Sequence, residues 1–241
     1  MIKQLALLAL LPFLARGASA QPVPDPPLVD AVKAGDTATL KALLAGGADL
    51  AAKDRHGWTA VMWAAGRADG ATLKALLDAG ADPAPKDEPG WSAIVEAAKG
   101  GRAENIPLLA AKGLDCAAKD AAGVSALAYA ATGSTRTISA LLACKAPVDA
   151  RDANGLTPLI RAAQLGRTAA VRRLLTAGAK VDAKDQLGYT ALMWAAHGGR
   201  SDTVSALLAA KADAGLRSGD GLTARELALK RGHPAAADLF K

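Results

Sequence analysis

A repeat of about 33 residues is the feature that most constrains this chain. Successive repeat glycines are 33 residues apart four times and 32 apart once, at Gly57, Gly90, Gly123, Gly155, Gly188 and Gly221. An aspartate precedes each of the first five by three residues, at Asp54, Asp87, Asp120, Asp152 and Asp185. A unit of this length buries too little apolar surface alone, so the pattern predicts a stacked array of units.

The unit 153–185 shows the local structure that we expect. Gly155 supplies the positive φ of a tight turn, and Thr157 is a suitable N-cap for a helix whose first residue is proline. Apolar residues at helical spacing predict a first helix over 158–165 and a second over about 168–177. Each unit therefore has the form turn, helix, helix.

The composition excludes two other classes of protein. With 51% hydrophobic residues the chain is too apolar to be disordered. Alanine and leucine dominate and aromatic residues make up only 3%, which favours helices over strands. We expect an all-α solenoid of helix-turn-helix units joined by β-turn or hairpin loops.

These motifs resemble the ankyrin repeat. Thr157-Pro158-Leu159-Ile160 is similar to the Thr-Pro-Leu-His signature of that family but lacks the histidine, and Gly47-Ala48-Asp49 resembles its unit ending. The resemblance covers residues 28–241, with units at 28–54, 55–87, 88–120, 121–152, 153–185, 186–218 and 219–241. It implies a non-enzymatic module that binds a protein partner on its concave face.

The N-terminus predicts export. Lys3 is followed by an apolar run of about ten residues and by the small-residue site Ala18-Ser19-Ala20, the pattern of a cleavable signal peptide. A spanning helix needs roughly 20 apolar residues, so a membrane anchor or a buried helix is the weaker interpretation. We expect a signal peptide over 1–20, a Pro-rich leader over 21–27, a periplasmic or secreted protein, and no stable membrane insertion.

The charge does not indicate nucleic acid. The net charge is +6, and without Lys3 and Arg16 there are 27 basic against 23 acidic residues, a net +4. Basic residues do recur next to the repeat aspartates. Because the signs alternate, we favour a self-neutralising edge over an anion-binding stripe. This basic row consists of Lys53, Lys86, Lys119, Arg151 and Lys184.

Nothing in the sequence predicts catalysis, a cofactor or a metal. There is no phosphate-binding glycine loop and no dinucleotide fingerprint. His56, His197 and His233 lie in different units without a second ligand at zinc spacing. For Cys116 and Cys144 we favour two buried apolar thiols over a disulfide, although an oxidising compartment permits a bond.

The aromatic residues suggest a binding face. Counted from the repeat aspartate as position 1, six of the seven aromatic residues after residue 20 occupy positions 5 and 10. These positions line the concave face in the proteins that the chain resembles, and tryptophan and tyrosine are enriched in binding hot spots. The other interpretation is packing against the next turn. The expected partner-binding residues are Arg55, His56, Trp58, Trp63, Arg67, Glu88, Trp91, Glu96, Lys99, Tyr129, Asn154, Arg161, Gln164, Gln186, Tyr189, Trp194 and His197.

Two functions remain at this stage. The first is an exported bacterial ankyrin-repeat protein, monomeric when unbound, that binds an unidentified protein; the resemblance implies toxin neutralisation or assistance to an envelope enzyme as candidate roles. The second is an exported effector whose basic surface binds an anionic polymer or a membrane. Salt separates them, because an electrostatic contact weakens steeply as ionic strength rises.

Overall fold

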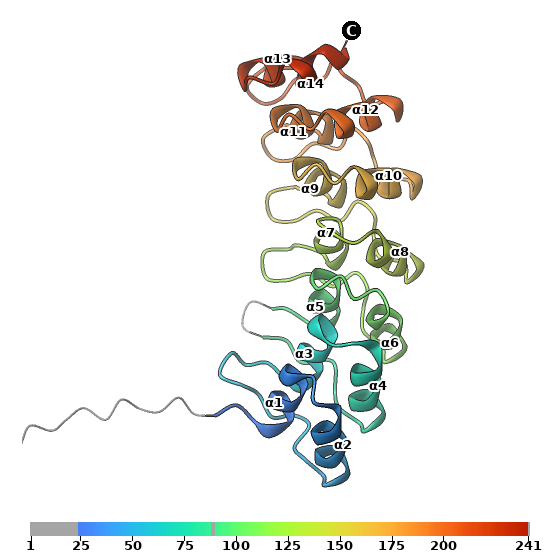
Figure 1. Ribbon diagram of the computed structural model, residues 1–241. Helices are drawn as coiled ribbons and strands as arrows, with labels where there is room; N and C mark the ends of the chain where they lie inside the picture. Colours follow the sequence, from blue (N-terminus) through green and yellow to red (C-terminus); the bar gives the residue numbers. More distant parts are fainter. Residues whose placement is uncertain (1–23, 88–89, 241) are drawn as a thin grey trace, which may run out of the picture.

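The computed structural model describes residues 24–87 and 90–240 and shows two parallel layers of stacked helices (Figure 1). The first layer consists of α1 (Pro27–Ala34), α3 (Ala60–Arg67), α5 (Ala93–Lys99), α7 (Ala126–Ala130), α9 (Pro158–Gln164), α11 (Ala191–His197) and α13 (Ala224–Lys230). The second consists of α2 (Thr37–Ala45), α4 (Gly70–Asp78), α6 (Asn105–Ala111), α8 (Thr135–Ala143), α10 (Thr168–Thr176), α12 (Ser201–Ala209) and α14 (Pro234–Ala237). The 3-10 turn η1 (Asp238–Phe240) follows. The expected all-α solenoid is confirmed.

The turns follow the predicted chemistry. All six repeat glycines have φ between 75° and 79°, which favours glycine. In one turn Asp152 Oδ1 accepts hydrogen bonds from the main-chain N–H of Asn154 (2.8 Å) and Leu156 (2.9 Å). The Thr157 hydroxyl then accepts from the N–H of Ile160, which caps α9. Three turns also contain an isolated β-bridge, such as Lys53 with Thr59.

A single apolar core runs between the two layers. The Ala-Ala pairs of the first layer are fully buried and let neighbouring helices approach closely, while leucines of the second layer fill the space between layers. Each helix of the first layer packs against its counterpart in the next unit, as do the helices of the second layer from α4 onward, so every unit depends on its neighbours.

The N-terminal segment is only partly described. The expected signal peptide over 1–20 lies outside the described residues, and so does most of the leader 21–27. Of that leader, Pro27 already forms the first residue of α1. Asp25 accepts a hydrogen bond from Lys33 Nζ (2.7 Å), which also bonds Asp54 (2.8 Å), so the end of the leader is tied to the first unit.

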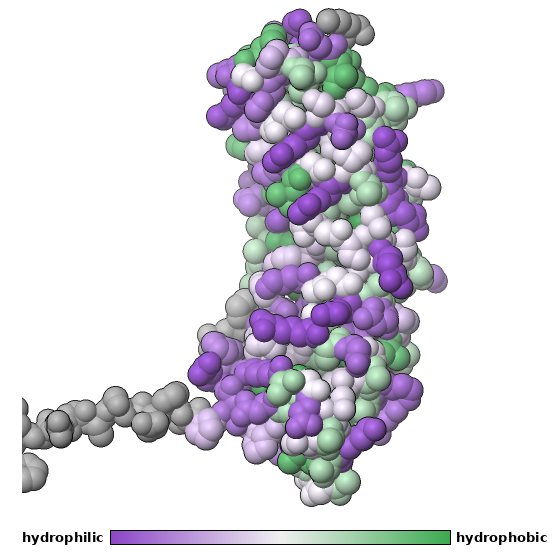
Figure 2. Space-filling view, in the orientation of Figure 1, coloured by the Kyte–Doolittle hydropathy of each residue, from purple (hydrophilic) through white to green (hydrophobic). Residues whose placement is uncertain are grey.

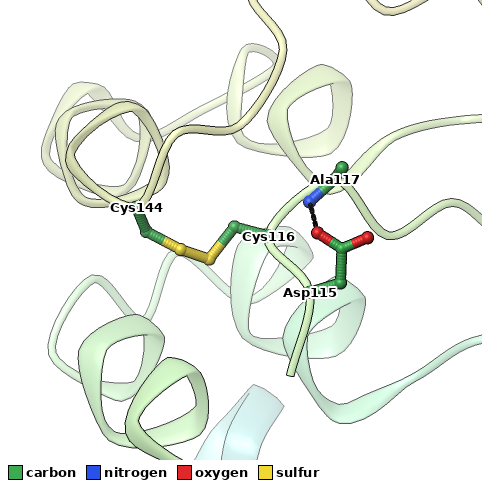
Figure 3. Close-up of a disulfide and its surroundings, with 4 residues drawn as sticks. All are labelled: Asp115, Cys116, Ala117 and Cys144. Carbon is green, nitrogen blue, oxygen red and sulfur yellow. Dashed lines mark hydrogen bonds between the residues drawn. A yellow bond between two sulfur atoms is a disulfide. The ribbon is translucent and has the colours of Figure 1, made fainter. Parts of the chain in front are cut away.

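The cysteines form a disulfide, so the expectation of two free thiols is wrong. Cys116 lies in the loop after α6, and Cys144 is the C-cap of α8 in the next unit; their Cα atoms are 6.1 Å apart, within disulfide range. Figure 3 shows Cys116 reaching across to the end of α8. Stacking brings together two residues that are 28 apart in sequence. The bond therefore joins unit 88–120 to unit 121–152.

Candidate protein-binding face

The turns project from the side of the first helix layer (Figure 1), and we call the surface formed by these turns and helices the turn face. At the turn tips, Arg55, His56, Asn154 and Gln186 are exposed as expected. Glu88 lies outside the described residues. The tips provide a row of polar side chains that a partner can contact without rearrangement of the core.

The aromatic residues at position 10 bond inward to their own turns. Trp63 Nε1 donates to Asp54 Oδ2 (2.8 Å), and Trp194 Nε1 donates to Asp185 Oδ2 (2.7 Å). The hydroxyl of Tyr129 makes the same bond nine residues back in sequence. These bonds fix the first helix to its turn, so the side chains have a structural role even though their rings remain half-exposed.

Asp54 shows how strongly such a turn is stabilised. Its burial disfavours the charge, but hydrogen bonds from Lys33, from the main-chain N–H groups of Trp58 and His56, and from the Trp63 indole hold its pKa at about 2. In another unit Arg161 takes the same position and forms an ion pair with the repeat aspartate. The residue at position 10 is therefore a hydrogen-bond donor in four units.

Glu96 breaks this pattern. It occupies position 10 of its unit, but it is 5% exposed, so it is not the surface residue that the sequence suggested. Burial raises its pKa to about 7; Asp87 adds to the increase, whereas Lys99 and Arg67 oppose it. The Trp58 indole, from the previous turn, donates to Asp87 instead (2.9 Å). Glu96 Oε1 is buried without a hydrogen-bond partner.

The rings of the turn face form pairs. Ring centroids are 4.8 Å apart for Trp58 and Trp63, 5.9 Å for Trp91 and Tyr129, and 5.1 Å for Tyr189 and Trp194. The first and third pairs lie within one unit, while the second pair links two units. Pairs at these separations contribute packing energy beyond their buried area.

Cations cover the rings in the N-terminal half of the face. Lys33 Nζ lies 4.4 Å and the Arg67 guanidinium carbon 4.3 Å from the Trp63 ring centroid, and Lys99 Nζ lies 3.6 Å from that of Trp91. Toward the C-terminus, a histidine packs on the aromatic pair in their place. In the N-terminal half of the turn face, cationic side chains therefore lie over the aromatic rings.

His197 lies 5.6 Å from the Trp194 ring and 6.4 Å from that of Tyr189, measured between centroids. Burial, Arg231 and His233 lower the pKa of His197, so it is neutral at pH 7. Gln164, at the end of α9, is half-buried. The C-terminal half of the face therefore combines neutral aromatic and amide groups.

The basic row joins consecutive turns. Lys119 Nζ donates to the main-chain oxygen of Arg151 (2.9 Å), Arg151 donates to that of Lys184, and Lys184 Nζ donates to that of Arg217 (2.9 Å). These three cations use hydrogen bonds to hold the array together. Such use favours the structural interpretation of the row over an anion-binding stripe.

Two exposed leucines are binding candidates that the sequence analysis missed. Leu187 is 61% exposed beside Gln186 at a turn tip, and Leu165 is 46% exposed just after α9. In Figure 2 the hydrophobic residues of the visible face form small patches separated by hydrophilic ones. The signal for Leu187 was available, because the other turn tips carry histidine, proline, alanine, asparagine or aspartate at that position.

The described residues contain no group of three or more histidine, cysteine or acidic side chains placed to hold a metal ion. Nor does any helix among them have the length and apolarity needed to cross a bilayer.

A stacked array of turn-helix-helix units with a row of exposed turn tips defines the class of repeat proteins that serve as binding scaffolds. The profile described as "Ankyrin repeats (3 copies)" matches residues 10–87, 28–120, 94–185 and 171–240 in overlapping segments. The chain belongs to the ankyrin-repeat family.

Solved structures agree with this assignment. The crystal structure of the ankyrin repeat domain of Bcl-3, described as a unique member of the IkappaB protein family, is 27% identical in sequence and superposes with a TM-score of 0.75. The match covers 90% of this chain and 98% of that domain. No curated protein sequence matches this chain. The fold is thus that of an interaction scaffold, and nothing in these comparisons indicates catalysis.

Proposed function

We propose that this protein binds a protein partner across its turn face, the concave side of an ankyrin array, and that it does so in the periplasm or after secretion. The row of exposed turn tips above a rigid first helix layer carries the proposal. Ankyrin arrays are interaction modules, and the tips differ from unit to unit while the buried positions repeat. Variable tips on a constant scaffold can specify one partner.

The disulfide supports the proposed compartment. Disulfides persist in oxidising environments and are rare in the cytosol. The bond between Cys116 and Cys144 joins two neighbouring units and agrees with the signal-peptide pattern over 1–20. We propose two alternative roles for the complex of this protein with its partner: neutralisation of a toxin, or assistance to an envelope enzyme.

The test is affinity capture from a cell-envelope extract. Trp63 and Trp194 are poor targets, because their replacement removes the indole hydrogen bond that fixes the first helix to its turn at Asp54 or Asp185. Exposed turn tips are better targets. The binding variant carries Arg55→Ala, His56→Ala, Asn154→Ala and Gln186→Ala. The control variant carries Lys41→Ala, Arg136→Ala and Arg172→Ala, which are exposed on the second helix layer.

We expect the wild type and the control to retain the same protein at moderate ionic strength and the turn-tip variant to lose it. Circular dichroism establishes that all three are folded. Loss in the control alone, or equal retention by all three, would contradict binding at the turn face. Binding that disappears in moderate salt for every variant, with recovery of anionic polymers or vesicles, would favour the second hypothesis.

A further inference from the structure

Glu96 lies at the junction between units 55–87 and 88–120, where α3 and α5 make an unusually close approach. A Cβ atom added to Gly100 would overlap the carbonyl oxygen of Gly66. A Cβ atom added to Gly66 would lie 3.2 Å from Glu96 Oε2 and 3.3 Å from Glu96 Cβ. The Glu96 carboxyl therefore lies against the main chain at the end of α3, almost fully buried.

Other bonds hold this junction closed. Asn105, fully buried at the start of α6, donates through Nδ2 to the main-chain oxygen of Ala65 (3.0 Å). Arg102 donates to the oxygen of Arg67 (2.9 Å), and Lys112 donates to that of Leu77 (3.2 Å). The carboxyl of Glu96 contributes no hydrogen bond to this set through Oε1. It is a titratable group enclosed by a contact that three other side chains bridge with hydrogen bonds.

Burial, rather than the charges around it, favours the neutral form of the Glu96 carboxyl. Among the described residues, the nearby charged and titratable groups are Lys99 on its own helix, Arg67 at the end of α3, Asp87 in the preceding turn and Tyr129 on α7. Lys99 and Arg67 also lie over aromatic rings, so each cation is shared between a ring and the Glu96 carboxyl. Asp87 repels an ionised Glu96, and burial removes the water that would solvate it.

We propose that Glu96 makes this junction a pH-responsive joint of the turn face, closed when its carboxyl is protonated and loosened when it is ionised. An ionised carboxylate needs water or a donor, and it obtains either when α3 and α5 separate. Trp91 and Lys99 lie on the first helix of this unit or just before it, so loosening disturbs the surface above them. The joint thus regulates partner binding, a consequence that rests on the proposed function.

The direction of the pH dependence follows from the pKa of Glu96 in the open and the closed junction. In the open junction its pKa returns to the ordinary value of 4.5, whereas in the closed junction it is about 7. The stabilisation of the closed state is fully present below pH 4.5 and is lost as the pH rises through 7. Between pH 6 and pH 8 these pKa values imply that the opening equilibrium increases about tenfold.

Hydrogen exchange of the unbound protein tests the joint directly. We expect the protection factors of α3 and α5 amides to fall about tenfold from pH 6 to pH 8, while those of α9 and α10 stay constant. Glu96→Gln, which is neutral at every pH, should abolish the fall. Glu104→Gln, an exposed glutamate of the same unit, serves as the matched control and should retain it.

A wild-type protein with constant protection, or a Glu96→Gln variant with the wild-type pH dependence, would overturn the proposal. An equal loss of the effect in Glu104→Gln would also overturn it. The wild-type measurement needs no variant to fold, and α10 provides an internal reference. Because no partner is present, failure here leaves the capture experiment unaffected, and failure of capture leaves the joint standing.

Discussion

Unit 88–120 and unit 186–218 share one repeat pattern but differ in how many of its hydrogen bonds they make. In unit 186–218, Thr190 caps α11 and Trp194 bonds the repeat aspartate. At the equivalent positions of unit 88–120, Ser92 makes no capping bond and Glu96 cannot donate when ionised. Of the six buried side-chain polar atoms without a partner among the described residues, four belong to this unit.

The second helix is also shorter in unit 88–120 than in unit 186–218. The helix α6 has seven residues, against nine in α12, and begins at Asn105. Pro107 explains the late start: it is the third residue of α6, within the first turn, where its missing N–H removes no helical bond. The comparison teaches that a repeat array tolerates one poorly satisfied unit when its neighbours, and here a disulfide, hold it in place.

Removal of the disulfide should give the largest effect. Cys116→Ala with Cys144→Ala releases a loop of 28 residues, and chain entropy predicts a loss of about 3.5 kcal/mol in the free energy of unfolding. Urea denaturation measures it. The double variant should no longer respond to a reductant, whereas the wild type should. A loss below about 1 kcal/mol would show that unit 88–120 is held by its packing alone.

A matched pair of glycine substitutions comes next. Gly100 and Gly198 occupy the same position of their units, and both have negative φ. Gly100→Ala places a methyl group against Gly66 and should cost about 2 kcal/mol. In Gly198→Ala the nearest atom is 3.4 Å away on the flexible side chain of Arg200, so we expect no loss of stability. Equal thermal midpoints would contradict the close approach of α3 and α5.

The smallest effect concerns the helix caps. Ser125 accepts a hydrogen bond from the N–H of Ala128 (3.1 Å), whereas the Ser92 hydroxyl has no partner. Ser125→Ala should cost about 1 kcal/mol, and Ser92→Ala should leave the unfolding free energy nearly unchanged. A similar cost at both serines would mean that unit 88–120 is as well capped as its neighbour.

The repeat register predicted most of the fold. The first helix expected over 158–165 is observed as Pro158–Gln164, and the second, expected over 168–177, as Thr168–Thr176. Both predictions rest on local rules for caps, proline and glycine, which depend on neighbours in sequence. Such rules transfer from one unit to the next because every unit repeats the same environment.

The contacts between units were harder to predict. The pairing of Cys116 with Cys144 depends on the distance between stacked units, which a spacing of 28 residues does not reveal. The inward bonds of Trp63 and Trp194 also went unrecognised, although a donor nine residues after the aspartate recurs in the sequence. Glu96 is the exception to that spacing, and its burial follows from helix packing that the sequence alone does not fix.

The disulfide also sets how far the chain can be drawn out under mechanical load. A stretched residue spans at most about 3.5 Å, so the segment between the two cysteines would contribute roughly 90 Å of extension if it were free. With the bond intact, that length stays closed while the units on either side unravel. Oxidised and reduced molecules pulled from their ends should therefore differ by one fixed increment of extension. That increment appears only after a reductant has broken the disulfide.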